Sequence, residues 1–142
     1  MPLTISTGDL DTFAMVAHEY EESLPLDLRH EDLDLRPDVA FVATDEGVPC
    51  GCVAFIIAGS DVRLRHLYVR PTHRNRGVAR TLLAAFIEAA RSRGACRIIL
   101  DTDRERLSSA YALYRSLGFV ECAPHGFVDY ATPTFMELTL DA

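Results

Sequence analysis

The sequence of 142 residues contains no lysine, and all 14 of its basic side chains other than histidine are arginines. Eleven of these arginines lie between Arg63 and Arg106, whereas the first forty residues are rich in aspartate and glutamate. The net charge of −7 disfavours a nucleic-acid-binding protein, and we expect no nucleic-acid partner. The arginine-rich middle favours a polyanionic cofactor. The acidic part favours a cationic substrate or is simply a solvated face.

Long hydrophobic runs are also missing. The longest, residues 52–58, has the length of a strand, and the N-terminus lacks the basic region and apolar core of a signal peptide. The four cysteines do not have the spacing of a zinc site. Cys50 and Cys52 would share one face of a strand as small apolar residues. We therefore expect a cytoplasmic protein with no membrane partner and no metal site.

Two common nucleotide-binding motifs are absent as well. A phosphate-binding loop of the Gly-x-x-x-x-Gly-Lys-Ser/Thr type does not occur in the sequence. Gly77 stands alone where a dinucleotide fingerprint needs three spaced glycines. Nucleotide-binding domains of these two kinds are therefore disfavoured.

Hydrophobic patterns predict the order of the secondary-structure elements. Strands are expected at residues 3–5, 39–44, 50–58, 62–69, 96–100, 119–122 and 134–140. Helices are expected at residues 9–23, 77–92 and 107–117, with a short one at 31–35, and Ser6 or Thr7 would cap the first. This order combines an antiparallel meander with one βαβ crossover. It indicates an α+β fold, a three-layer α/β/α sandwich, in a single domain over residues 1–142.

The segment of residues 67–83 is the most informative one. An apolar strand ends at Pro71, and Arg76-Gly77 then opens the long helix. A strand that turns sharply into a helix presents free backbone N–H groups and the positive end of the helix dipole, so this turn favours phosphate. Gly77 lets the backbone approach a ligand closely, and the arginines of the turn add fixed charge.

Two motifs carry a resemblance to a known family. The string Arg74-Asn75-Arg76-Gly77-Val78-Ala79 matches the Arg/Gln-x-x-Gly-x-Gly/Ala signature of the GNAT superfamily of acyl-CoA N-acyltransferases. Residues 109–119 resemble a later helix of that family, usually readable as Ala-x-x-Leu-Tyr-x-x-x-Gly-Phe. Two signatures in the right order, about 35 residues apart, make the resemblance specific. It extends over roughly residues 41–140.

The resemblance implies a mixed, mostly antiparallel central sheet, the GNAT fold, which splays between its fourth and fifth strands. It also implies an acetyl-CoA-dependent N-acetyltransferase that moves an acetyl group to a primary amine by direct transfer. The cofactor-binding residues carried over from the family are Leu67, Tyr68, Val69, Arg74, Asn75, Arg76, Gly77, Val78, Ala79 and Arg80. The first three would pair their backbone with the pantetheine amides, and the Val69 N–H would polarise the thioester carbonyl. The other residues would hold the pyrophosphate.

The resemblance also suggests catalytic residues. Tyr114 matches the tyrosine that often serves this family as general acid for the leaving thiolate, and a core tyrosine is the alternative. Many relatives carry a glutamate base on the fourth strand, but this chain has Arg63 near that position and no carboxylate in residues 62–69. Asp101, which ends the fifth strand, is a candidate base or a turn-capping aspartate. His66 could serve instead, but alternation favours a packed or solvated histidine, and an amine that arrives neutral needs no base.

The acceptor is expected to bind beside these groups. Residues 125–133 are long for a hairpin loop, and with Tyr20 and residues 24–38 they would form its pocket. A small-molecule amine is the expected partner. The alternatives are a protein N-acetyltransferase and a non-catalytic acyl-CoA-binding or regulatory domain on the same fold, which the missing fourth-strand carboxylate favours. A homodimer is compatible with the sequence.

Overall fold

The computed structural model of the chain describes residues 3–29, 36–126, 128 and 130–140. Its strands are β1 (Leu3–Thr7), β2 (Val39–Asp45), β3 (Val48–Ala58), β4 (Asp61–Val69), β5 (Arg97–Thr102), β6 (Val120–Glu121) and β7 (Thr134–Thr139). Its helices are α1 (Leu10–Ser23), α2 (Val78–Ser92) and α3 (Ser108–Ser116), with the 3-10 turns η1 (Leu26–Leu28) and η2 (Pro71–His73). The strands and longer helices predicted from the sequence are present. The short helix predicted at residues 31–35 lies outside the described residues.

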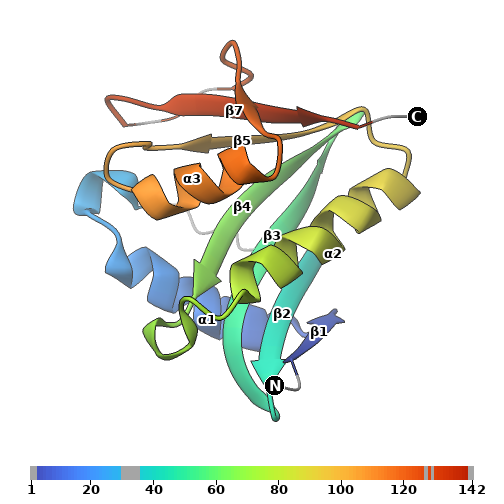
Figure 1. The fold of residues 1–142 in the computed structure, drawn as a ribbon, viewed down its shortest axis with the longest axis vertical. Helices are drawn as coiled ribbons and strands as arrows, with labels where there is room; N and C mark the ends of the chain where they lie inside the picture. The colour runs from blue at the N-terminus through green and yellow to red at the C-terminus, as the bar shows by residue number, and fades with distance from the viewer. Residues whose placement is uncertain (1–2, 30–35, 127, 129, 141–142) are drawn as a thin grey trace.

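The seven strands form one sheet in the order β1-β2-β3-β4-β5-β7-β6. Neighbours are antiparallel except for β4 and β5, which are parallel because α2 forms the crossover between them. The β4–β5 ladder is short, since it pairs residues 61–63 with 97–99 and then ends. Beyond it the two strands diverge, as Figure 1 shows, and this confirms the predicted splay between the fourth and fifth strands.

Helices cover both faces of this sheet. In Figure 1, α2 and α3 lie in front of the sheet and α1 lies behind it. Leu82, Leu83 and Phe86 of α2 are buried in the main core, whereas Phe13 and Val16 of α1 are buried in a second cluster against the other face. These layers confirm the predicted α+β sandwich.

The starts of the helices follow from local side-chain and backbone chemistry. Asp9 caps α1 by accepting a hydrogen bond from the Thr12 N–H at 3.0 Å. The predicted cap at Ser6 or Thr7 was wrong, because β1 extends to Thr7 and both residues pair with β2. Gly77 caps α2 with a left-handed φ of 77°, a conformation that a side chain would strain. Within the described part of the chain, every helix is too short or too polar to cross a membrane.

Cys50 and Cys52 do not share a face, contrary to the prediction from strand alternation. Cys50 is buried in the main core under α2, and Cys52 is buried in the cluster under α1. The reason is a bulge, because the β2–β3 register shifts after Ala43 and leaves one extra residue in β3. A Cβ on the adjacent Gly51 would lie 2.8 Å from the Tyr68 carbonyl oxygen, so the close approach of β3 and β4 requires glycine there.

Candidate active site

The divergence of β4 and β5 opens a cleft that holds a cavity of about 390 Å³. The end of α1 with Leu24 and Pro25 forms one wall, and residues 67–69 of β4 form the floor. Residues 106–110 at the start of α3 form the other wall. The cleft therefore brings together the β4 segment and part of the turn that the sequence predicts to hold acetyl-CoA.

The backbone of β4 along this cleft is available to a ligand. Its ladder to β5 ends at Arg63, so the edge of residues 64–69 that faces β5 has no strand partner in the described chain. The Arg70 N–H donates to the Cys50 carbonyl of β3 at 2.8 Å. Successive N–H groups of a strand point to opposite sides, so the Val69 N–H points away from β3 and toward the open edge. This direction is the one that the predicted role of Val69 requires.

The turn before α2 surrounds a free helix N-terminus with exposed cations. Asn75 and Gly77 have positive φ angles of 62° and 77°, which steer the chain into α2. The first turn of α2 contains no acidic residue and no side chain of the described residues caps it, so these leave the positive end of the helix dipole without a negative charge. Arg76 is exposed, and Arg80 reaches α3 by donating to the Ser116 hydroxyl at 2.9 Å.

Arg74 folds back over β4. Its Nε donates to the Val69 carbonyl oxygen at 3.1 Å, and its guanidinium carbon lies 5.8 Å from the centroid of the Tyr68 ring. The Nε2 of the neighbouring His73 lies 3.1 Å from a carboxylate oxygen of Asp45, so this side chain is already paired with an acid. Arg74 is thus the arginine of this turn that lines the cleft.

A smaller cavity of about 90 Å³ between β4 and β5 brings the two predicted catalytic residues together. Tyr114 reaches it from α3, where its side chain is 5% exposed, and Asp101 reaches it from β5. The residues that line both this cavity and the larger one are Tyr20, Leu67, Leu107 and Ala110. The two cavities are therefore neighbours within the same splay.

The surroundings of Tyr114 keep its phenol protonated. Burial raises the pKa of Tyr114, and the negative charge of Asp101 raises it further. The ring packs on Phe119, with 5.6 Å between the ring centroids. The hydroxyl has no hydrogen-bond partner among the described residues, so it is available to a ligand in the smaller cavity.

Asp101 accepts a hydrogen bond from the Tyr130 hydroxyl at 2.9 Å. Tyr130 belongs to the segment of residues 125–133, so this contact brings the predicted acceptor loop to the site. Phe127 and Asp129 of the same segment lie outside the described residues. A carboxylate has about four lone-pair sites, so Asp101 can bind a further donor.

His66 is packed on the face opposite Leu67. Its side chain is 7% exposed, and its Nε2 lies 3.2 Å from a carboxylate oxygen of Glu21. A bulge in β4 gives His66 a φ of 55° and turns it toward α1, where its ring meets the edge of Phe13 at 6.4 Å between centroids. This arrangement supports the packed alternative, although the residue also borders the smaller cavity.

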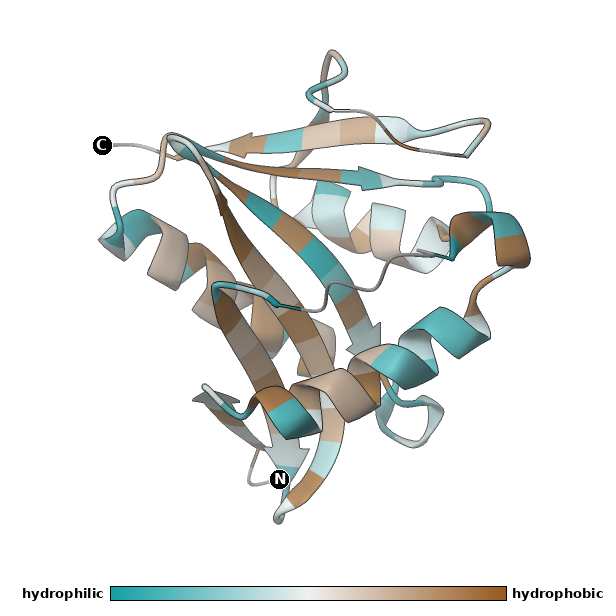
Figure 2. Cartoon of the chain, turned by 180° about the vertical axis from the view of Figure 1, so that it is seen from behind, coloured by the Kyte–Doolittle hydropathy of each residue, from teal (hydrophilic) through white to brown (hydrophobic). Residues whose placement is uncertain are grey.

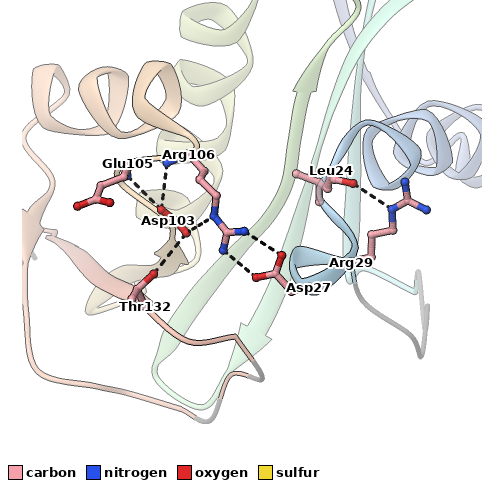
Figure 3. Close-up of polar contacts among 7 residues, drawn as sticks. All are labelled: Leu24, Asp27, Arg29, Asp103, Glu105, Arg106 and Thr132. Carbon is pink, nitrogen blue, oxygen red and sulfur yellow. Dashed lines mark hydrogen bonds and ion pairs between the residues drawn. The ribbon is translucent and has the colours of Figure 1, made fainter.

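Arg106, which was not predicted as a site residue, joins the two walls of the cleft with its side chain. Its guanidinium donates to both carboxylate oxygens of Asp27 at 2.8 Å and to Asp103 at 2.7 Å, as Figure 3 shows. Asp103 also accepts hydrogen bonds from the N–H groups of Glu105 and Arg106, which fixes the approach to α3. Asp27 and Arg106 are 79 positions apart, and no local pattern reveals such a pair.

These groups fit acetyl-CoA. An open strand edge can pair with the pantetheine amides, and the exposed cations and N–H groups at the start of α2 can bind phosphates. Residues 67–69 of the strand edge and Arg74 and Ala79 beside the start of α2 line one cleft, so a single extended ligand can reach both.

Comparisons with known proteins agree with this reading. The profile of the acetyltransferase (GNAT) family matches residues 9–119. The uncharacterized N-acetyltransferase C1271.07c of Schizosaccharomyces pombe is 30% identical over 146 residues, which cover 93% of this chain and 89% of that protein. The IAA acetyltransferase of Azospirillum brasilense is 33% identical over 94 residues, or 64% of this chain and 61% of that protein. The structure of yncA from Salmonella typhimurium with its cofactor acetyl-CoA has a TM-score of 0.76 and 25% identity, covering 100% of this chain and 96% of that one. The chain therefore belongs to the acetyltransferase (GNAT) family and is an acyltransferase.

Proposed function

We propose that this acyltransferase moves the acetyl group of acetyl-CoA to a primary amine of a small molecule, by direct transfer and without a covalent enzyme intermediate. The observation that carries the proposal is the pair of neighbouring cavities in the splay of the sheet. The larger borders the open edge of β4 and the arginine turn, and the smaller borders Tyr114 and Asp101. A thioester bound along the larger cavity would thus meet an amine in the smaller one.

Acetyl-CoA supplies the activated acetyl group when it is bound, and the chain's own groups hold it. In this proposal the backbone of residues 67–69 pairs with the amides, and the Val69 N–H donates to the thioester carbonyl oxygen. The phosphates are bound by the N–H groups and side chains of Arg74, Asn75, Arg76, Gly77, Val78, Ala79 and Arg80.

In this proposal one side chain accepts a proton from the acceptor and another donates a proton to the leaving group. Asp101 accepts a proton from the acceptor ammonium, so that a neutral amine can attack. As the C–N bond forms and the C–S bond breaks, Tyr114 donates its phenolic proton to the sulfur of the departing thiolate, and the second proton that the amine nitrogen loses restores the phenol. The raised pKa of Tyr114 supports this role, because it keeps the proton on the phenol until a base such as the thiolate is formed beside it.

Two other functions remain candidates on specific observations. Residues 61–69 of β4 contain only one carboxylate, Asp61, which pairs with Arg97 at 3.0 Å, and this favours a non-catalytic acyl-CoA-binding domain. A protein N-terminus is the other candidate acceptor. The small volume of the inner cavity, about 90 Å³, favours a small molecule over it.

A thiol-release assay over a panel of amines and N-terminal peptides tests the proposal. We expect acetyl-CoA-dependent release of free thiol with at least one small primary amine, and mass spectrometry should find the acetylated product. Calorimetry on the same preparation measures acetyl-CoA binding. Binding without turnover on any acceptor would favour the non-catalytic domain, and turnover on peptides alone would favour a protein substrate.

A further inference from the structure

Strand β4 carries two arginines, Arg63 and Arg65, that point to the face of the sheet covered by α1. Val62 and Leu64 are buried in the main core under α2, so the alternating residues Arg63 and Arg65 point to the opposite face. Figure 2, which views that side, shows β4 alternating between hydrophilic and hydrophobic bands, whereas β3 beside it is hydrophobic along most of its length. Positions two apart on a strand are roughly 7 Å apart, so both guanidinium groups can reach one ligand.

Neither arginine has a carboxylate partner among the described residues. Arg65 has no hydrogen bond or ion pair there, and its buried Nε is unsatisfied. Within the described part of the chain, Arg63 donates only to the His125 carbonyl oxygen, at 3.4 Å, and it packs against Gly126.

The partly buried arginines elsewhere are paired. Arg70 binds Glu19, and Arg97 binds both Asp61 and Glu137. Removing a guanidinium from water without an anionic partner is costly. Among the partly buried arginines of the described residues, Arg63 and Arg65 are therefore the exceptions that lack a carboxylate partner, and an anionic ligand would remove the cost.

The positive charges of the two arginines also repel each other, and a nearby anion would relieve this repulsion. Burial lowers the pKa of Arg63, and the positive charge of Arg65 lowers it further. Asp101 and Asp61 act in the opposite direction without forming an ion pair with Arg63. An added anion between the arginines would therefore be stabilised by both charges.

Arg65 lines the same small cavity as Asp101 and Tyr114. The geometry points to an acceptor that carries a carboxylate near its reactive amine, an amino-acid zwitterion, with its carboxylate on Arg65 and Arg63 and its ammonium beside Asp101. This inference rests on the proposed function and names its substrate class. Glu21 of α1, on the same face, is already engaged by His66, whose Nε2 lies 3.2 Å from its carboxylate oxygen.

The inference revises the expectation of a cationic acceptor drawn from the acidic N-terminal part. Two carboxylates of that part already have basic partners, since Glu22 lies 2.9 Å from His18 and Asp27 binds Arg106. It also disfavours peptide N-termini, in which the α-carboxylate has become an amide.

Pairs of acceptor amines that differ only in carrying a carboxylate or its amide test this inference. We would measure kcat/KM for L-amino acids and β-alanine against their amides, with the wild-type protein, with Arg65→Gln and with the control Arg91→Gln on the exposed side of α2. Carboxylates should be preferred over amides by the wild type and by Arg91→Gln. In Arg65→Gln the preference should fall about 10- to 100-fold, the range for losing one charged hydrogen bond. Arg65→Lys, which keeps the charge, should retain part of it.

The readouts separate failure of this inference from failure of the proposed function. Acetyl-CoA affinity should be the same in all variants, and thermal melting checks that they fold. If amides or diamines react as well as the carboxylates with the wild type, the inference fails while the acetyltransferase stands. An unchanged preference in folded Arg65→Gln would also overturn it. If acetyl-CoA binds but no amine of either panel reacts, both fail.

Discussion

Asp27 and Arg106 form a bidentate ion pair, with both N–O distances 2.8 Å, that connects the segment after α1 to the approach of α3. The pair spans the cleft, because Leu24 and Pro25 line one wall and Arg106 lines the other. The buried carboxylate of Asp103 accepts a hydrogen bond from the Nε of the same guanidinium, so Arg106 lies between two carboxylates (Figure 3). The walls of the proposed acetyl-CoA site are thus held by a contact between distant parts of the chain.

Removing Arg106 should therefore destabilise the protein more than removing the charge of Asp27. Arg106→Gln loses both ion pairs and leaves Asp103 buried without its cation, whereas Asp27→Asn leaves the Arg106–Asp103 contact intact. Melting temperatures at low and high salt measure the difference. The effect of Asp27→Asn should shrink with salt, because the pair is exposed. Equal losses for the two variants would show that Asp103 does not depend on Arg106.

The same cluster predicts a loss of stability in acid. Hydrogen bonds from Arg106 lower the pKa of Asp27, and hydrogen bonds from the N–H and side chain of Arg106 lower the pKa of Asp103. A carboxyl whose pKa is lower in the folded state stabilises the fold above its unfolded pKa of about 4 and loses that contribution as pH falls through the folded value. The melting temperature should therefore fall below about pH 4. The fall should be shallower in Asp27→Asn, and identical acid profiles would contradict the assignment.

The strands and helices could be predicted because their signals are local. The period of α2 and the glycine after the strand-to-helix turn identified this part of the fold, and Leu82 and Phe86 are fully buried as that period requires. The faces of β3 could not be predicted, since its bulge depends on the register with β2 and reverses the alternation between Cys50 and Cys52.

The site was predictable to the extent that the family motifs mark it. Tyr114 and Asp101 lie on one cavity, although the roles assigned to them remain predictions. Arg106 was missed, and the contact of Tyr130 with Asp101 was not predicted, because the partners Asp27 and Asp101 are distant in sequence. Arg65 had a local signal, since arginines at alternate positions of a half-buried strand are unusual, but that no described residue pairs with it appears only in three dimensions.

Gly77 tests the phosphate site. Gly77→Glu should weaken acetyl-CoA binding by more than about tenfold, because it places an anion where the pyrophosphate is proposed to bind. No heavy atom lies within 4 Å of a Cβ built there, so the loss should come from charge and from the positive φ of 77° rather than from a clash inside the protein. Gly77→Asn is the matched control, since asparagine tolerates this conformation without charge. Calorimetry that gives both variants the wild-type affinity would refute the site.

Tyr114 tests the proton donor. Tyr114→Phe keeps the ring packing on Phe119 and removes a hydroxyl without a described partner, so stability and acetyl-CoA affinity should change little. If the phenol protonates the thiolate, kcat should fall roughly 10²- to 10⁴-fold. The raised pKa of Tyr114 also predicts no loss of wild-type activity near pH 10, where an ordinary phenol ionises. A near-normal kcat in an assay limited by chemistry would make Tyr114 a core residue only.

Substitution of Asp101 tests its proposed role as the base, and the pH dependence of kcat/KM distinguishes this role from a structural one. Asp101→Asn can still accept the hydrogen bond of Tyr130 but cannot take a proton, so kcat/KM should fall roughly 10²- to 10⁴-fold near neutral pH. The deficit should shrink as pH rises toward the pKa of the acceptor amine, because an increasing fraction then arrives neutral. Tyr130→Phe is the control, since it removes the contact and keeps the carboxylate, and its effect should be smaller and independent of pH. A deficit in Asp101→Asn that stays constant with pH would assign Asp101 to positioning, and the absence of any deficit would mean that the amine needs no base from this chain.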